Sequence, residues 1–259
     1  MSVYMKSRAP VWYSGRPLRL VECRNCGLVT ASPRPKIHDL DPDCPAGWQR
    51  AREAYDRKLA RPSVQNVYRK HLKRALDQLG RPAQTLFDMG CGAGTMMTAA
   101  REAGLEASGN DLNAYAVERL REDGFDAFPC LTHDLPVLPQ KDVVINFDYL
   151  EHSFTPFDDL RRCRRLLADD GILFLKTLYL GSRDHRAEGE RWRLFGIGHL
   201  QFFRLQTLLA MVADAGFTLE HVETPHLVFF LARVRAKEAP HSRGLGRVSS
   251  SCGARVTPA

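Results

Sequence analysis

The spacing of hydrophobic and polar positions changes near residue 62. From residue 63 to 79 apolar residues recur at three- and four-residue steps, Pro62 and Ser63 favour a helix start, and Gly80 follows the run. This pattern predicts an amphipathic helix. Beyond it, short apolar runs and helical stripes alternate. Strands that alternate with helices of about 10 to 15 residues indicate a parallel sheet covered by helices on both faces.

The pattern predicts further elements along the rest of this segment. The predicted strands are 85–89, 106–109, 125–128, 142–147 and 172–177, and the further helices are 95–103, 113–122, 157–167 and 205–212. Two last apolar runs, 217–222 and 227–234, have no helix between them, which predicts an antiparallel hairpin at the sheet edge. We therefore expect an α/β fold with a mostly parallel, seven-stranded central sheet over residues 63–237.

Both ends of the chain differ from this central domain. Residues 1–47 hold six prolines, too many for a helix, so we expect residues 1–62 to form a small irregular lobe with one hairpin near 18–21 and 27–30. Residues 238–259 lack an apolar period and are rich in Ser and Arg. We expect them to be a disordered tail.

Composition and charge exclude several classes of protein. The 259 residues are 44% hydrophobic and 26% charged, as in a globular protein. No apolar run approaches the roughly 18 residues of a membrane helix, residues 1–20 do not look like a secretory signal, and seven cysteines are an odd number. We expect a cytoplasmic protein with reduced thiols and no membrane partner.

The net charge of +7 is unevenly distributed. Residues 1–74 carry 16 Lys and Arg against 6 Asp and Glu, whereas residues 75–231 carry 15 against 23. The central domain is therefore acidic, which argues against a nucleic-acid partner for it, although the basic lobe could contact an anion.

A glycine-rich turn follows the first predicted strand of the domain. The segment Asp88-Met89-Gly90-Cys91-Gly92-Ala93-Gly94 joins that strand to a helix, where ligands bind in open α/β sheets. Thr95 replaces the third glycine of a dinucleotide fingerprint, and no Gly-Lys-Ser/Thr of a P-loop follows. Asp111 ends the next strand, where a carboxylate can accept both hydroxyls of a ribose. The turn and Asp111 together predict a nucleoside site.

These segments also resemble a known family. The glycine turn resembles the first motif of class I S-adenosylmethionine-dependent methyltransferases, and Asn110-Asp111-Leu112 resembles their ribose-binding acidic turn. Asp134-Leu135-Pro136 and Phe147-Asp148-Tyr149-Leu150-Glu151-His152 are similar to later motifs of the small-molecule branch that carries Leu-Glu-His. Asp169-Asp170-Gly171 departs from the usual Pro-Gly-Gly. The resemblance covers residues 76–234 and implies a Rossmann-like methyltransferase fold.

The resemblance implies a site for the methyl donor, S-adenosylmethionine. Its implied binding residues are Asp88, Gly90, Cys91, Gly92, Gly94, Asp111, Leu112, Thr132, His133, Phe147 and Asp148. The glycines and Cys91 would pack beside the methionine part, Asp111 would bind the ribose, and Thr132 and His133 would flank the adenine. Phe147 and Asp148 would border the sulphonium, although Phe147 could equally be an ordinary core residue.

The acceptor side rests on fewer signals. Methyl transfer is an in-line displacement that depends on positioning, and a base is needed only if the acceptor must lose a proton. The candidates for a base or acceptor contact are His199, in a segment resembling the branch's His-Leu-x-x-Phe element, and Tyr149, with His152 as a weaker one. The insertion 179–198 mixes arginines with Trp192 and Phe195, which would suit an anionic or planar acceptor.

The lobe contains one motif typical of metal binding. Cys23-Arg24-Asn25-Cys26-Gly27 has the spacing of a zinc knuckle, but no cysteine precedes Cys23. A structural zinc needs four ligands, so His38 and Cys44, or a partner chain, would have to complete the set. We therefore assign no metal ligands from the sequence.

The sequence thus predicts S-adenosylmethionine-dependent methyl transfer to a small molecule. One alternative is a binding or regulatory module that holds the same compound without catalysis. Another is a different use of the donor, such as cyclisation. The sequence determines neither the acceptor, nor whether oxygen, nitrogen or carbon is methylated, nor the oligomeric state.

Overall fold

A computed structural model describes residues 2–10, 17–34, 57, 60–195, 198–224 and 228–234. Its main body is a seven-stranded sheet in the order β11-β12-β8-β7-β4-β5-β6. The strands are β4 (Thr85–Met89), β5 (Glu106–Asn110), β6 (Asp126–Phe128), β7 (Lys141–Phe147), β8 (Leu167–Thr177), β11 (Phe217–Glu223) and β12 (Val228–Val234). Strands β6, β5, β4, β7 and β8 pair in parallel, and β12 and β11 pair antiparallel at the β8 edge. The predicted fold class and edge hairpin are confirmed.

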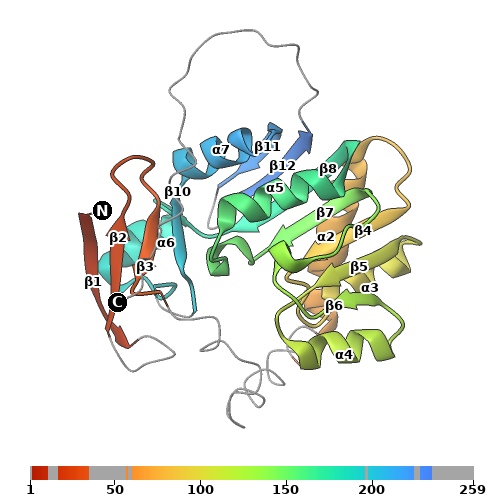
Figure 1. The fold of residues 1–259 in the computed structure, drawn as a ribbon, viewed down its shortest axis with the longest axis horizontal. Coiled ribbons are helices and arrows are strands. Elements are labelled where there is room, and N and C mark those ends of the chain that lie inside the picture. The colour runs from red at the N-terminus through yellow and green to blue at the C-terminus, as the bar shows by residue number, and fades with distance from the viewer. Residues whose placement is uncertain are drawn as a thin grey trace, which may run out of the picture.

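Helices cover both faces of this sheet (Figure 1). They are α2 (Pro62–Leu79), α3 (Thr95–Glu102), α4 (Ala114–Glu122), α5 (Pro156–Leu166) and α7 (Leu205–Asp214). Val143, Ile145 and Phe147 of β7 lie in one core cluster with α2 and α3, whereas Val144 lies in the cluster of α5 and α7. This alternation follows from the two-residue period of a strand, which needs apolar side chains on both faces.

The chain order of the strands reverses beside β4. Both β5 and β7 pair with β4, so successive units extend the sheet in opposite directions from it. The loops after β4 and β7 therefore diverge at the carboxyl edge, where ligands bind in such sheets. The glycine turn lies at this edge.

The lobe forms a second sheet, which later parts of the chain complete. Its order is β1-β2-β3-β10-β9, with β1 (Ser2–Pro10), β2 (Pro17–Glu22), β3 (Val29–Ser32), β9 (Tyr179–Leu180) and β10 (Gln201–Arg204). The predicted hairpin corresponds to β2 and β3, which pair antiparallel. Strand β10 joins β3 across more than 160 residues of sequence, and Figure 1 shows the lobe at one end of the molecule beside β10 and α6 (Arg183–Glu188).

The insertion 179–198 contains regular structure. It contains β9, α6 and the 3₁₀ helix η4 (Gly189–Arg191). Trp192 and Phe195, with 2% and 6% of their surface exposed, pack against Leu20 and Val29 of the lobe. These two aromatic side chains thus belong to the core of the lobe, and the hypothesis that the insertion suits an anionic or planar acceptor stays a prediction. The residues predicted as a tail lie outside the described part of the chain.

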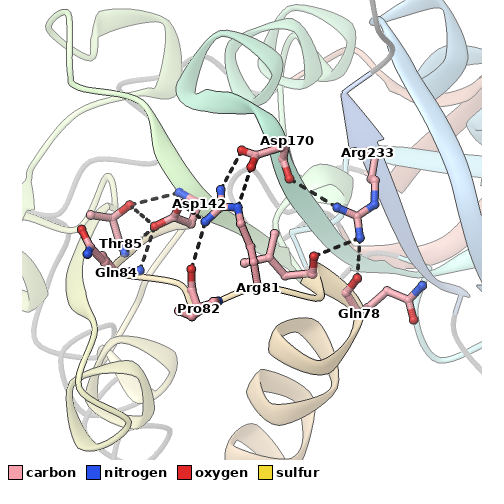
Figure 2. A network of polar contacts seen from close by, with 9 residues as sticks. Gln78, Arg81, Pro82, Gln84, Thr85, Asp142, Asp170 and Arg233 are labelled. Carbon is pink, nitrogen blue, oxygen red and sulfur yellow. Dashed lines mark hydrogen bonds and ion pairs between the residues drawn. The ribbon is translucent and has the colours of Figure 1, made fainter.

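An ion-pair network connects the amino-terminal ends of β4 and β7 with β8 and with the loop after α2 (Figure 2). Arg81, just after α2, pairs with Asp142 at 2.7 Å and with Asp170 at 2.6 Å. Asp142 also accepts hydrogen bonds from the backbone of Gln84 and Thr85 at 2.8 and 3.0 Å. Because the network lies at the opposite edge of the sheet from the glycine turn, we assign it to stability rather than to the site.

Candidate active site

The glycine turn has a backbone that few other residues could adopt. Gly90, Gly92 and Gly94 have φ angles of 69°, 53° and 73°, in the left-handed region that favours glycine. A Cβ atom on Gly90 would lie 2.5 Å from Cδ2 of Tyr149. Position 90 is therefore restricted to glycine twice, by its φ angle and by the ring packed on it.

The Asp111 carboxylate organises the glycine turn. One of its carboxylate oxygens accepts a hydrogen bond from the amide of Gly92 at 2.9 Å, and the other accepts from the amide of Asn113 at 2.8 Å. Asn113 in turn caps α4 through its side chain. The carboxylate thus joins the turn after β4 to the turn after β5, a role that the sequence did not reveal.

Asp88 is a buried acid at the end of β4, with 5% of its surface exposed. Burial and, to a smaller extent, the negative charge of Asp111 raise the pKa of Asp88 to about 8. Its carboxyl group is therefore largely protonated at neutral pH. A cationic group nearby would favour the charged form.

Tyr149 lies in a buried polar network. Its hydroxyl lies 2.6 Å from the Thr132 hydroxyl and donates to the Asp159 carboxylate at 3.1 Å. Ser153 donates to the same carboxylate oxygen. Burial, and then the charge of Asp159, raise the pKa of Tyr149 well above its ordinary value. Tyr149, which the sequence suggested as a base or acceptor contact, thus has its ring beside Gly90 and its hydroxyl hydrogen-bonded to Thr132 and Asp159.

The other predicted donor residues surround the same edge. Cys91 is buried and donates its amide to the Asn110 carbonyl at 2.9 Å, whereas Leu112 is half-buried and His133 is exposed. Thr132 is buried in the 3₁₀ helix η2 (Thr132–Asp134), and its hydroxyl is bound by Tyr149. Thr132 therefore presents little side-chain surface to a ligand.

Phe147 and Asp148 end β7 in different environments. The Phe147 ring packs at 4.9 Å from the Phe174 ring and at 5.4 Å from His71, so it belongs to the core on the α2 face. Asp148 has a φ of 51° and forms an ion pair with Lys176 of β8. This positive φ outside glycine is a strained conformation of the kind found at functional sites.

Glu151, His152 and His199 meet beyond the end of β7. Glu151 and His152 lie in the 3₁₀ helix η3 (Leu150–His152), while His199 precedes β10. The rings of His152 and His199 are 4.7 Å apart. Burial, and then the charge of Asp148, raise the pKa of Glu151 to about 7, while burial lowers the pKa of His199. The sequence analysis predicted His199, and as a weaker candidate His152, as a base or acceptor contact. It assigned no separate function to Glu151.

The lobe cysteines lie in a tight turn. The amide of Gly27 donates to the Cys23 carbonyl at 2.9 Å, and the amide of Cys23 donates to the Leu28 carbonyl at 2.8 Å. His38 and Cys44, which the zinc hypothesis also needs, lie outside the described residues. The zinc hypothesis therefore stays a prediction.

Comparison of the sequence with known families identifies the family of this chain. A family model described as a methyltransferase domain matches residues 57–222. The chain belongs to this methyltransferase family. The match contains the glycine turn, Asp111 and the β7 segment, and thus every predicted donor residue. Within the described residues of this family member, no helix is long and apolar enough to cross a membrane.

Individual relatives are more distant. A ubiquinone biosynthesis O-methyltransferase of Haemophilus ducreyi is 28% identical over 105 residues, which cover 36% of this chain and 44% of that protein. The chain thus matches less than half of that relative. Magnesium protoporphyrin IX methyltransferase of Synechocystis PCC 6803, solved with S-adenosylhomocysteine, has a TM-score of 0.59 at 17% identity, covering 77% and 98% of the two chains.

A second solved structure has the same fold but a different chemistry in its name. The [4+2]-cyclase SpnF has a TM-score of 0.54 at 17% identity and covers 66% of this chain and 81% of its own. At such identities the likeness shows the fold, and the reaction must be argued from the site.

Proposed function

We propose that this protein transfers the methyl group of S-adenosylmethionine to a small-molecule acceptor. The observation that carries the proposal is the turn after β4, in which Gly90 and Gly92 have positive φ angles and the Gly92 amide donates a hydrogen bond to Asp111. Such a turn lets a ligand approach the main chain, and the neighbouring carboxylate suits a ribose. A small-molecule acceptor rather than nucleic acid, and a cytoplasmic location, belong to the same proposal.

The donor residues divide by the part of the molecule that each would bind. Gly90, Cys91, Gly92 and Gly94 would pack along the methionine part, and Asp88 would face its ammonium group. Asp111 would exchange its hydrogen bond to Gly92 for the ribose hydroxyls. The adenine would lie between Leu112 and the segment of Thr132 and His133. The sulphonium would lie beyond the end of β7, near Asp148 and the small exposed part of Phe147.

The acceptor would approach from the side of η3 and the lobe. His199 is our candidate for contact with the acceptor, and Tyr149 is a positioning residue because its ring packs beside Gly90. In the reaction, the bond from sulphur to the methyl carbon breaks as the acceptor atom bonds to that carbon. The sulphonium becomes the neutral thioether of S-adenosylhomocysteine, so positioning supplies much of the rate.

Donor binding is tested by calorimetry with S-adenosylhomocysteine, the spent donor. We expect one site per chain, and at least a tenfold weaker affinity for Gly90→Ala. Gly104→Ala is the matched control: Gly104 has a φ of 86°, but a Cβ atom added there would have no neighbouring atom within 4 Å, so the change introduces backbone strain away from the site. Absence of binding to the wild-type protein, or equal binding by both variants, contradicts the proposal.

Because a protein named as a cyclase has a similar fold, methyl transfer must be distinguished from other uses of the donor site. Incubation of the protein with S-adenosylmethionine and a panel of phenols, amines and acids distinguishes the candidates by product. S-adenosylhomocysteine indicates methyl transfer, and methylthioadenosine indicates another use of the donor. Tight binding with neither product across the panel indicates a binding module.

A further inference from the structure

Glu151, His152 and His199 offer one ligand atom each, and these atoms lie within 4.8 Å of one another. Two of the residues are neighbours in η3, and the third comes from a segment almost fifty residues later. The backbone holds the two segments together, because the amide of Leu200 donates to the carbonyl of Glu151 at 2.7 Å. The cluster is therefore built into the fold.

The hydrogen bonds of the two imidazoles determine which nitrogen is free. Nδ1 of His152 lies 3.0 Å from the Gly198 carbonyl, and Nδ1 of His199 lies 2.7 Å from the Leu194 carbonyl. A carbonyl oxygen only accepts, so each Nδ1 carries the proton, and in the neutral ring Nε2 keeps its lone pair. Metal-binding histidines are commonly oriented by such a bond at the other nitrogen.

The carboxylate is fixed in a comparable way. Thr177 of β8 donates its hydroxyl to Oε2 of Glu151 at 2.7 Å, and Glu151 exposes only 3% of its surface. Across the described ranges, no salt bridge joins Glu151 to a lysine or arginine, and the nearby Lys176 is paired with Asp148. A cation bound here would favour the charged, metal-binding form of this buried carboxyl group.

We propose that Glu151, His152 and His199 bind one divalent transition-metal ion, with two imidazoles and one carboxylate as ligands. This donor set suits zinc and chemically similar ions, and it resembles catalytic rather than structural zinc sites because a coordination position stays open. Ligand atoms around a tetrahedral zinc are about 3.4 Å apart, so binding would draw the three side chains together.

The position of the cluster suggests what the open coordination position binds. Glu151 follows Tyr149, which packs beside Gly90, by two residues, so the ion would lie next to the proposed donor site. An oxygen of the acceptor, such as a hydroxyl, would bind there and lose its proton to water more readily. This assignment of the ligand rests on the proposed function, whereas the metal site itself does not.

The test uses the full-length chain with Cys23→Ser and Cys26→Ser, so that the lobe cysteines cannot bind the probe. After treatment with a chelator and its removal, the protein is titrated with Co²⁺, followed by visible absorption, and then with Zn²⁺ in competition. We expect one ion per chain, and roughly 100-fold weaker binding for His199→Ala and His152→Ala, since losing a ligand costs at least as much as losing an outer partner.

His221→Ala is the matched control. His221 hydrogen-bonds to Glu223 at 2.8 Å, so it has a carboxylate neighbour but is absent from the three-residue cluster, and we expect unchanged Co²⁺ binding. Glu151→Gln keeps the size of the side chain and should also weaken binding, which covers the case in which an alanine variant fails to fold. Less than half an equivalent of Co²⁺, or equal binding by the His199 variant, overturns the proposal.

Calorimetry with S-adenosylhomocysteine on the same samples separates the two proposals. Donor binding without metal binding would refute the metal site and leave the proposed function intact. Metal binding without donor binding would support the ion and refute the methyl-donor site.

Discussion

Asp88 makes the stability of the protein depend on pH at the scale of a single residue. Its pKa is raised to about 8, whereas in the unfolded chain it returns to the ordinary value near 4. Between about pH 4 and pH 8 the folded state therefore binds one more proton than the unfolded state. Through this window the contribution of Asp88 to stability falls as pH rises, by at most about 1.4 kcal/mol per pH unit.

We expect Asp88→Asn to flatten this dependence, because an amide has no proton to lose. Measured by urea unfolding, the stability of the wild-type protein should be lower at about pH 7 than at about pH 5. In Asp88→Asn this difference should be smaller by about 1–2 kcal/mol. Asp126→Asn, an exposed position at the start of β6, is the control. If wild type and Asp88→Asn showed the same pH dependence of stability, folding would not raise the pKa of Asp88.

Among the elements, the amino ends of β4, β7 and β8 depend on Asp142. Burial alone would raise the pKa of Asp142, but hydrogen bonds from Gln84, Arg81 and Thr85 outweigh it and the pKa is lowered. A lowered pKa means that this stabilisation is complete above the unfolded value near 4 and is lost as pH falls through the folded value.

We expect Asp142→Ala to cost about 1–3 kcal/mol at neutral pH, because it leaves two backbone amides without their acceptor and removes one of the two carboxylates paired with Arg81. The cost should shrink in acid, as the pH falls through the lowered pKa of Asp142 and the wild-type carboxylate becomes protonated. Asp77→Ala removes an exposed helix pair with Lys73 and should cost under about 0.5 kcal/mol. Affinity for S-adenosylhomocysteine should stay within about twofold. A larger loss of affinity would mean that the network supports the site.

For the molecule as a whole, the lobe and the central domain share a sheet. The predicted boundary at residue 62 remains a prediction, yet β3 pairs with β10, and Leu20 of β2 packs in the same cluster as Trp192 and Phe202. The lobe, which precedes the central domain, is thus joined to the segment between β8 and β11. His199, which directly precedes this junction, depends on the lobe for its position.

We expect Leu20→Ala to destabilise the protein by about 2–5 kcal/mol, since Leu20 is fully buried. Turnover of an acceptor should fall further than affinity for the spent donor, because the change lies on the His199 side. Val67→Ala, at a residue with 49% of its surface exposed on α2, should cost under about 0.5 kcal/mol. Thermal unfolding, calorimetry and product formation measure the three effects, and equal losses of binding and turnover would contradict the argument.

Much of the central domain was predictable because its signals are local. The predicted strand 85–89 is β4 as observed, and the helix expected from 63 to 79 is α2 with Gly80 as its left-handed cap. Periodicity and helix stops depend on neighbouring residues only, so a single sequence carries them. The environment of the insertion was not predictable in this way, because Trp192 and Phe195 share a core cluster with Leu20 and Val29, which lie more than 160 residues earlier in the chain.

The sequence by itself determined the alternation of strands and helices, the glycine turn and the acid after β5. Each depends on backbone preferences or on short-range spacing, which chain neighbours fix. Only the tertiary structure decided that Tyr149 packs beside Gly90 and that His199 meets Glu151 and His152. Contacts between distant segments depend on how sheets and loops pack in three dimensions, and local pattern carries no information about that packing.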